Sequence, residues 1–315
     1  MTNKERYSEW AQAQEFIPLF MMPWWLDAVC AGKEWDVLLA EDNEGHIVGA
    51  MPYMLSKKLW FKYIVMPPYT SVGGIWVTPE MTGDRWKTAE VCRQITEQLD
   101  KMGLVYYEQR YLPGSLCVDA LRALGFKTRE RASYRFEDLS DLDAVIDGFS
   151  KTKRRQLQKA LSLHAEHTMD VEDFIRFHHH CLAAKKRKMP YSREFLLVLE
   201  RKAKRLGQCE ILSIHNADGQ PLAAAFIVWD KVFMHFVIPC YDPAFGESGA
   251  SALLVLEALK KAREKHLRFE FGDPDDRITL KEHKLFNPKP FKYFSVEKSY
   301  KGFMAFIIRC AERFT

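Results

Sequence analysis

The stretches "CEILSIHNADGQPLAAAFIVW", from Cys209 to Trp229, and "WDVLLAEDNEGHIVGAMPYML", from Trp35 to Leu55, have the same form. Each is an apolar run, then a turn rich in Asp, Asn and Gly, then a second apolar run, which is the pattern of a β-hairpin. A pattern that occurs twice at this length predicts two copies of one structural arrangement.

The likeness between the two halves extends beyond the hairpins. Third strands are expected in "WFKYIVMP" and "VFMHFVIP", each ending at a proline that cannot continue a ladder. Amphipathic helices follow in "DRWKTAEVCRQITEQLDKMG" and "SGASALLVLEALKKAREKH", and then the short strands "LVYYEQ" and "LRFEFG". The segments "LRALGFKTRERASYRF" and "LKEHKLFNPKPFKYFSV" also correspond. The repeat therefore predicts, twice, three strands, a helix, a strand, a helix and a strand.

Helices are expected ahead of each hairpin. In the first half "SEWAQAQEF" and "PWWLDAVCAG" predict two short ones, and residues 142–206 predict longer ones in the second half. We therefore expect an α/β fold with mixed sheets in two tandem domains, residues 1–138 and 139–315. A chain of 315 residues suits two domains of ordinary size.

Composition excludes several classes of protein. With 47% hydrophobic residues the chain can bury two cores, and no run approaches the roughly 18 apolar residues of a membrane span. The N-terminal "MTNKERYSEW" has no apolar segment of a signal peptide, so a cytoplasmic location is expected. The seven cysteines contain no CxxC pair, which indicates reduced, mostly buried thiols.

Charge is concentrated in one segment. Residues 151–205 carry 15 basic and 6 acidic side chains, whereas the rest of the chain carries 31 and 36. Within it, "KTKRRQLQK" places Lys151, Arg155 and Lys159 on one stripe of a helix, with Arg154 beside them. Either this is a solvated helical face, or it binds a polyanion such as transfer RNA, a nucleotide-linked precursor or an anionic membrane surface. No DNA partner is expected.

The order of elements resembles the GNAT acyltransferase fold, and two such units resemble the Fem-type (FemAB-like) peptidyltransferases and their GNAT-like relatives. The resemblance covers nearly the whole chain and is most specific in "FSKTKRRQLQKAL", "IPCYDPAFGESGASALL" and "FEFGDPDDRITLKEHKLFN". It implies an N-acyltransferase that uses acyl-CoA as donor. It also implies that the second domain, with its basic segment, binds the donor, and that the first domain has lost this capacity.

The loop at residues 243–251 is the candidate donor site. Small residues that lead into a helix expose backbone N–H groups, and the helix dipole adds positive potential that suits a pyrophosphate. The candidates are Gly246, Ser248, Gly249, Ala250 and Ser251. Gly246 stands where the family usually has Gln or Arg. An ordinary turn with a serine cap is the alternative. A bulky residue at Gly249 is expected to abolish donor binding while leaving the fold intact.

Acyl transfer to an amine requires removal of a proton, stabilisation of an oxyanion and protonation of the leaving group. In the GNAT plan the amine attacks directly, and a backbone N–H near the end of strand 232–238 would polarise the carbonyl. The candidate proton-transfer groups are Tyr241, Glu270 and Asp273, with Asp242 beside them. Glu270 lies between two phenylalanines in a strand, so it faces away from one apolar layer.

Further residues are candidates for substrate binding. The resemblance favours Lys284 for contact with a phosphate or carboxylate of the substrate, with Arg277 as second choice. Tyr69 and its aromatic neighbours line either an acceptor site in the first domain or its core. The acceptor is expected to be a small or nucleotide-linked amine.

A metal site is not expected. The three histidines at 178–180 point about 100° apart on a helix and cannot converge on one ion. His164 and His167 can share a helical face, but the sequence suggests no third ligand for them.

Three functions remain open. The first is an acyl-CoA-dependent N-acyltransferase, the second an aminoacyl-tRNA-dependent transferase that acts on a cell-wall precursor, and the third a non-catalytic binding or scaffold protein. Binding to RNA phosphates would weaken strongly with salt, and binding of one coenzyme much less.

Overall fold

The computed structural model describes residues 1–14, 17–30, 33–272 and 277–302 of the 315-residue chain. The chain forms two compact units. Unit 1 comprises Met1–Arg131 together with the chain from Lys292, and unit 2 comprises Ala132–Phe291. These bounds differ from the expected division at residues 138 and 139, because the last described strand of the chain pairs within unit 1.

Unit 1 contains a mixed sheet. Strands β1, β2 and β3 pair antiparallel in sequence, β3 pairs parallel with β5, and β5 pairs antiparallel with β12, while β4 pairs with β2. Its elements are α1 (Asn3–Ala13), η1 (Leu19–Met21), α2 (Pro23–Val29), β1 (Trp35–Glu41), β2 (Ile47–Lys58), β3 (Phe61–Val65), β4 (Trp76–Val77), α3 (Pro79–Thr82), α4 (Arg85–Lys101), β5 (Leu104–Tyr111), α5 (Leu116–Ala123) and β12 (Lys289–Ser299).

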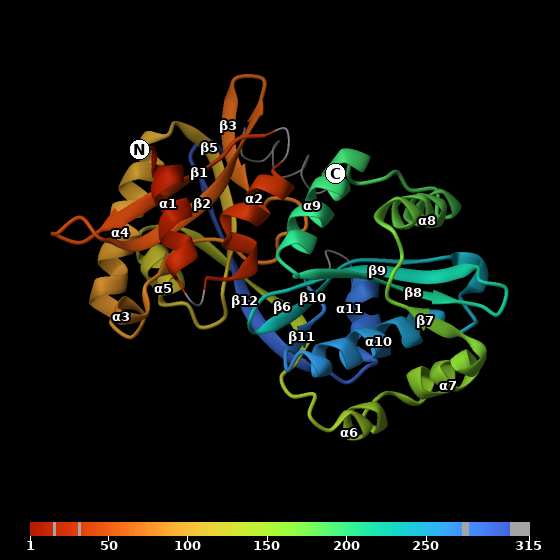
Figure 1. The fold of residues 1–315 in the computed structure, drawn as a ribbon. Coiled ribbons are helices and arrows are strands. Elements are labelled where there is room, and N and C mark those ends of the chain that lie inside the picture. The colour runs from red at the N-terminus through yellow and green to blue at the C-terminus, as the bar shows by residue number, and fades with distance from the viewer. Residues whose placement is uncertain (15–16, 31–32, 273–276, 303–315) are drawn as a thin grey trace. The chain divides into compact units, whose positions relative to one another are not determined.

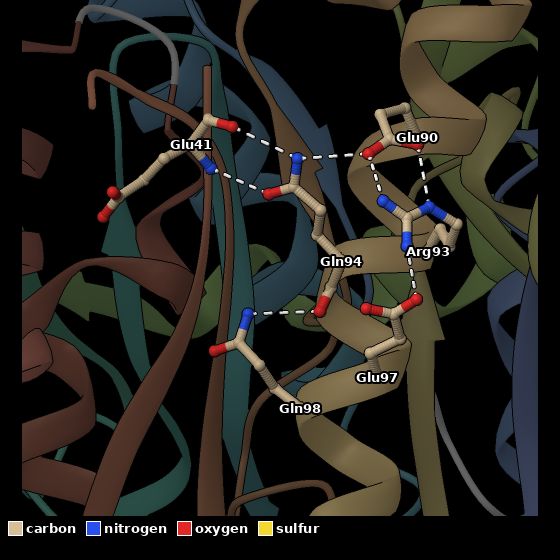
Figure 2. Close-up of polar contacts among 6 residues, drawn as sticks. All are labelled: Glu41, Glu90, Arg93, Gln94, Glu97 and Gln98. Atoms are coloured by element: carbon tan, nitrogen blue, oxygen red, sulfur yellow. Dashed lines mark hydrogen bonds and ion pairs between the residues drawn. The ribbon is translucent and has the colours of Figure 1, made fainter. Parts of the chain in front are cut away.

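The core of unit 1 lies between this sheet and the apolar faces of α4 and α5. Helix α4 buries residues at helical spacing, among them Val91, Ile95 and Leu99. Its polar face holds the end of β1, because the Gln94 amide accepts from the N–H of Glu41 at 3.1 Å and donates to its C=O at 3.2 Å (Figure 2). These two bonds satisfy backbone groups at the register shift that ends the β1–β2 ladder.

The strands of unit 2 are hydrogen-bonded in the order β6-β11-β10-β9-β8-β7. Its strands pair antiparallel except β10 and β11, which are parallel. Its elements are β6 (Lys127–Phe136, beginning in unit 1), α6 (Leu142–Asp147), α7 (Lys151–Lys159), η2 (Ala160–Ser162), β7 (His164–Glu166), α8 (Val171–Ala184), α9 (Arg193–Arg205), β8 (Cys209–His215), β9 (Pro221–Trp229), β10 (Phe233–Tyr241), η3 (Pro243–Phe245), α10 (Ala250–Glu264), β11 (Arg268–Glu270) and α11 (Arg277–Lys284).

Helices cover both faces of the unit 2 sheet. The long helix α10 packs on β8 to β11 from one side, and α8 and α9 pack on β8 to β10 from the other (Figure 1). Strand β9 is consequently buried on both faces from Leu222 to Trp229, which explains its nearly continuous apolar sequence. Helix α10 is rich in Ala and Leu, which are strong helix formers.

The observed elements follow the order that the repeat predicts in both halves of the chain. Strand β4 and helix α3 of unit 1 are additional to this order, and two other features were not expected. Strand β7 interrupts the helical segment 142–206. In addition, the last strand of each half pairs outside its own half of the sequence, because β12 pairs with β5 in unit 1 and β6 ends beside β11 in unit 2. The amphipathic C-terminal segment 303–315 lies outside the described residues.

The cysteine interpretation agrees with the structure. Cys30, Cys92, Cys117, Cys181 and Cys240 are free and buried, and Cys209 is free and half-buried. Within the described part of the chain, no helix combines the length and apolarity needed to cross a membrane.

Candidate active site

Strands β10 and β11 pair over only three residues. Phe233 to His235 of β10 pair with Arg268 to Glu270 of β11. In contrast, β10 remains paired with β9 as far as Tyr241. Beyond His235, the β11-facing edge of β10 therefore has no strand partner among the described residues. Such an edge presents backbone donors and acceptors to an extended ligand.

The unpaired part of β10 begins at a β-bulge. The register with β9 shifts between Phe236 and Ile238, which leaves Val237 as the extra residue. A bulge changes the direction in which the neighbouring backbone N–H and C=O groups point. The bulge therefore lies at the point where the sequence analysis expects an N–H to polarise a carbonyl, near the end of strand 232–238.

The prediction that β10 ends at its proline is wrong, because Pro239 pairs with Ala225 and the strand continues to Tyr241. Asp242 donates its N–H to Leu222 on the β9 side. Along a strand, the N–H groups of successive residues point alternately to the two neighbouring strands. Because the N–H of Asp242 points to β9, that of Tyr241 points to the open edge. Pro239, two residues earlier, also faces the open edge, where no ladder donor is needed. A proline is tolerated at such a position.

The loop after β10 is held by its own side chains. The Asp242 carboxylate, only 5% exposed, accepts from the N–H of Ala244 at 2.9 Å and lies 3.0 Å from His180 Nε2. The Ser248 hydroxyl donates to Phe245 O at 2.6 Å and accepts from the N–H of Ala250 at 3.2 Å. Asp242 and Ser248 are thus structural residues of this loop.

Two N–H groups at the start of α10 remain available. Gly249 is the N-cap of this helix and offers no side-chain cap, and Ser251 lies in its first turn. Among the described residues, the backbone N–H groups of Gly249 and Ser251 have no hydrogen-bond partner. Unpaired N–H groups at the N-terminus of a 15-residue helix form a site suited to an anion.

Gly249 is required by the packing of the protein itself. Its φ of +83° lies in the left-handed region. A Cβ built there would lie 2.0 Å from the backbone oxygen of Gln156 in α7. The structure therefore contradicts the expectation that a bulky residue at Gly249 would leave the fold intact. Gly246 has ordinary helical angles, and a Cβ there would meet nothing closer than 3.5 Å.

Helix α7 brings positive charge to this loop. Lys151, Arg154, Arg155 and Lys159 are all exposed, as the stripe predicts, and Lys159 pairs with Glu247 of the loop at 3.0 Å. Lys153 was not predicted from the sequence. Its side chain is buried, its Nζ lies 2.9 Å from a Glu282 carboxylate oxygen, and it lies over the Phe286 ring. Lys153 fixes α7 against α11, whereas the exposed cations remain accessible to a polyanion.

Tyr241 ends β10 and Glu270 ends β11, but the register does not bring them together. Glu270 is level with His235, six residues before Tyr241, and lies on the opposite face of the sheet. Tyr241 is half-buried, and burial raises the pKa of its phenol well above the ordinary value, with smaller contributions from Cys240 and Glu282. The phenol therefore remains protonated well above neutral pH. Glu270 is half-buried and occupies the last paired position of β11, between His235 of β10 and Arg135 of β6 in the strand register.

The remaining candidates lie elsewhere. Asp273 lies outside the described residues, and Arg277 begins α11 but its side chain is not among those described. Lys284 is exposed at the end of α11. Tyr69 belongs to unit 1, where it is half-buried with a φ of +54°, and burial raises the pKa of its phenol. Tyr69 therefore belongs to unit 1, and its role in an acceptor site stays a prediction.

The three consecutive histidines have different environments, as expected. His178 is buried, its Nδ1 lies 2.6 Å from the Tyr191 hydroxyl, and burial lowers the pKa of its imidazole to about 4. His179 is exposed, and His180 contacts Asp242. They do not converge on one point.

Comparison with known proteins identifies the family of the chain. The family described as "Acetyltransferase (GNAT) domain" matches residues 126–285, just over half of the chain. The chain therefore belongs to this GNAT family, which places it in the acyltransferase class. No curated protein matches the sequence significantly.

Several solved structures share the fold. FemX is 10% identical and covers 98% of both chains with a TM-score of 0.69. The tandem GNAT protein from the clavulanic acid biosynthesis pathway is 11% identical, covers 94% of this chain and 93% of its own, and has a TM-score of 0.59. A conserved protein from Bacteroides thetaiotaomicron is 13% identical, with coverages of 87% and 90% and a TM-score of 0.61. The predicted α/β class and the GNAT-like fold are thus confirmed.

Proposed function

We propose that the protein transfers an acyl group from an acyl-CoA thioester to an amine acceptor by direct attack of the amine. The observation that carries this proposal is the combination of an unpaired β10 edge with unpaired N–H groups at the start of α10. Only the seven residues from Asp242 to Ser248 separate these two features. An extended pantetheine arm with a pyrophosphate at one end has the chemistry that such a pair of features recognises.

The donor would be held mainly by backbone. The N–H groups of Gly249 and Ser251 would bind the pyrophosphate, with Lys159 adding positive charge after release of its exposed ion pair with Glu247. Breaking that pair costs little, because Glu247 is 97% exposed and such pairs contribute less than about 1 kcal/mol. The backbone of β10 next to the Val237 bulge would polarise the thioester carbonyl.

One side chain would move a proton. Tyr241 would donate a proton to the leaving thiolate, and the attacking amine would release its proton to solvent. Glu270 does not serve the same centre, because its partner His235 pairs with Val228 of β9 whereas Tyr241 pairs with Ala223, which places the two side chains on opposite faces of the sheet. Burial raises the pKa of the Tyr241 phenol, so the proton is present throughout the neutral range when the thiolate leaves. No covalent intermediate on the enzyme is needed, since the amine attacks the thioester itself.

A second candidate donor is aminoacyl-tRNA. It is favoured by the exposed Lys151, Arg154 and Arg155 on α7, the helix that packs against the start of α10. Backbone N–H groups and nearby cations can bind phosphates of either donor. The two donors differ in the number of phosphates contacted, so salt dependence distinguishes them.

Ser251→Asp tests the anion site without disturbing the fold. A carboxylate in the first turn of α10 stabilises the helix dipole by about 0.3–1 kcal/mol. The same charge repels a pyrophosphate, so the affinity for coenzyme A is expected to fall by about tenfold or more. Isothermal titration calorimetry with coenzyme A and a thermal melt of each variant measure both effects.

Ser192→Asp is the matched control. Ser192 caps α9 by accepting the N–H of Phe195 at 3.2 Å, and Asp is an equally good cap. This variant should bind coenzyme A like the unmodified protein. Equal affinities for Ser251→Asp and Ser192→Asp would exclude the start of α10 as the pyrophosphate site.

A further inference from the structure

A second group of polar side chains lies at the other edge of the unit 2 sheet. In the β7–β8 ladder, His164 pairs with His215 and Glu166 pairs with Ser213. Alternation along each strand places these four side chains on one face. Ala165 and Ile214, between them, belong to the core on the opposite face. The ligand atoms of His164, Glu166 and His215 all lie within 4.8 Å of one another.

A backbone carbonyl fixes the orientation of the His215 imidazole. Its Nδ1 lies 3.0 Å from the backbone oxygen of Gly219, so Nδ1 carries the proton and donates it to that carbonyl. Its Nε2 therefore carries the lone pair and lies 2.9 Å from the Ser213 hydroxyl. That hydroxyl can donate to Nε2 or to the backbone oxygen of Glu166 at 3.5 Å, and an ion at Nε2 requires the second arrangement. A backbone carbonyl that orients an imidazole in this way is a common feature of metal-binding histidines.

The distances fit a tetrahedral metal site. His164 Nε2 lies 3.5 Å from Glu166 Oε1, and His215 Nε2 lies 3.5 Å from Glu166 Oε2. Charge-assisted hydrogen bonds are shorter, at about 2.7–2.9 Å. Ligand atoms bound to Zn²⁺ at 2.0–2.1 Å in tetrahedral geometry lie about 3.3–3.4 Å apart. The two distances end on different oxygens of Glu166, and the three ligand atoms lie within 4.8 Å of one another, so a bound ion would draw the three side chains slightly closer together.

An open pocket of about 590 Å³ adjoins the cluster, and Glu166 and His215 form part of its wall. The rest of the wall comes from the β7–α8 connection (residues 168–170), from the β8–β9 turn and from α8, including Arg176 and Phe177. His164 and Glu166 are also about half exposed, so an ion can reach all three side chains. An ion held by three protein ligands keeps one coordination position for water or a small ligand.

We propose that His164, Glu166 and His215 bind one divalent transition-metal ion, Zn²⁺ by preference, with its fourth position open to this pocket. Two imidazoles and one carboxylate are a ligand set that zinc accepts. The ion would also join the three-residue strand β7 to β8. This site is separate from the proposed donor site, which lies at β10 and the start of α10.

The test uses the full chain without a polyhistidine tag, stripped of metal with a chelator. Titration with Zn²⁺ should show one ion per chain with micromolar or tighter affinity, and Co²⁺ should give the visible absorption of tetrahedral coordination. His164→Ala and Glu166→Gln should each weaken binding by more than about 100-fold, since loss of an outer partner alone costs 10- to 100-fold. Both side chains are exposed enough for these variants to fold.

His167→Ala is the control. His167 is next to the cluster in sequence, but its Nδ1 lies 2.6 Å from Glu210 and it is not one of the three ligands. This variant should keep full affinity, and Zn²⁺ should raise the melting temperature of the unmodified protein and of His167→Ala only. Absence of stoichiometric binding, or binding that survives His164→Ala and Glu166→Gln, would overturn the proposal.

Discussion

Gly249→Ala is expected to lower the free energy of unfolding by about 2–5 kcal/mol. An alanine must adopt the left-handed backbone at φ +83°, and its Cβ must displace the backbone of Gln156, 2.0 Å away. A backbone atom cannot move aside as a flexible side chain can, so α7 itself must shift. Thermal unfolding should show a fall of the melting temperature on the order of 10 °C.

Gly246→Ala makes the same chemical change three residues earlier. Gly246 has helical backbone angles, and its added Cβ would only reach ordinary contact with Pro243 O at 3.5 Å. We expect a change of less than about 0.5 kcal/mol, as for surface substitutions away from special features. Equal melting temperatures for the two variants would show that α7 does not pack against the start of α10 as described.

Tyr241→Phe is expected to lower kcat for acyl transfer by about 100-fold while KM for the donor changes little. The change removes only the phenolic hydroxyl, and loss of a general acid typically costs 10²–10⁴-fold. Because burial holds the pKa above its ordinary value, the unmodified enzyme should show no loss of the protonated phenol as pH rises through 9. Steady-state kinetics across the pH range measure both quantities.

Tyr134→Phe is the control, because Tyr134 packs against the same core from β6, beside β11 rather than β10. This variant should keep the activity of the unmodified enzyme. A Tyr241→Phe enzyme with unchanged kcat would remove the phenol from the mechanism and leave protonation of the thiolate to solvent.

Local patterns predicted most of the secondary structure. The hairpins from Trp35 and Cys209 and the helices α4 and α10 are encoded by alternation, turn residues and helical spacing, which are properties of short stretches. The end of β10 was not predictable in this way. A proline ends a strand only where its missing N–H would have faced a paired strand. The register with β9 shows that Pro239 faces the open edge, so the strand continues.

The site features that sequence analysis missed depend on contacts between distant segments. Gly249 suggested a ligand loop, but Gln156 lies 93 positions earlier in the chain and supplies the steric reason for the glycine. The proposed metal site joins His164 and Glu166 to His215 across the β7–β8 ladder. Its one local signal was the i, i+2 spacing of His164 and Glu166, which fits a strand rather than the expected helix.

The most direct test of the proposed function is a thermal-shift series with acyl-CoA esters and with bulk charged transfer RNA, each at low and physiological salt. A ligand at about 100 times its dissociation constant adds about 2.7 kcal/mol of stability, which corresponds to a shift of several degrees. We predict a shift with an acyl-CoA ester that persists at physiological salt. A shift only with transfer RNA that disappears as salt rises would assign the donor to RNA. No shift with any of these ligands would contradict the transferase account and favour a binding or scaffold role.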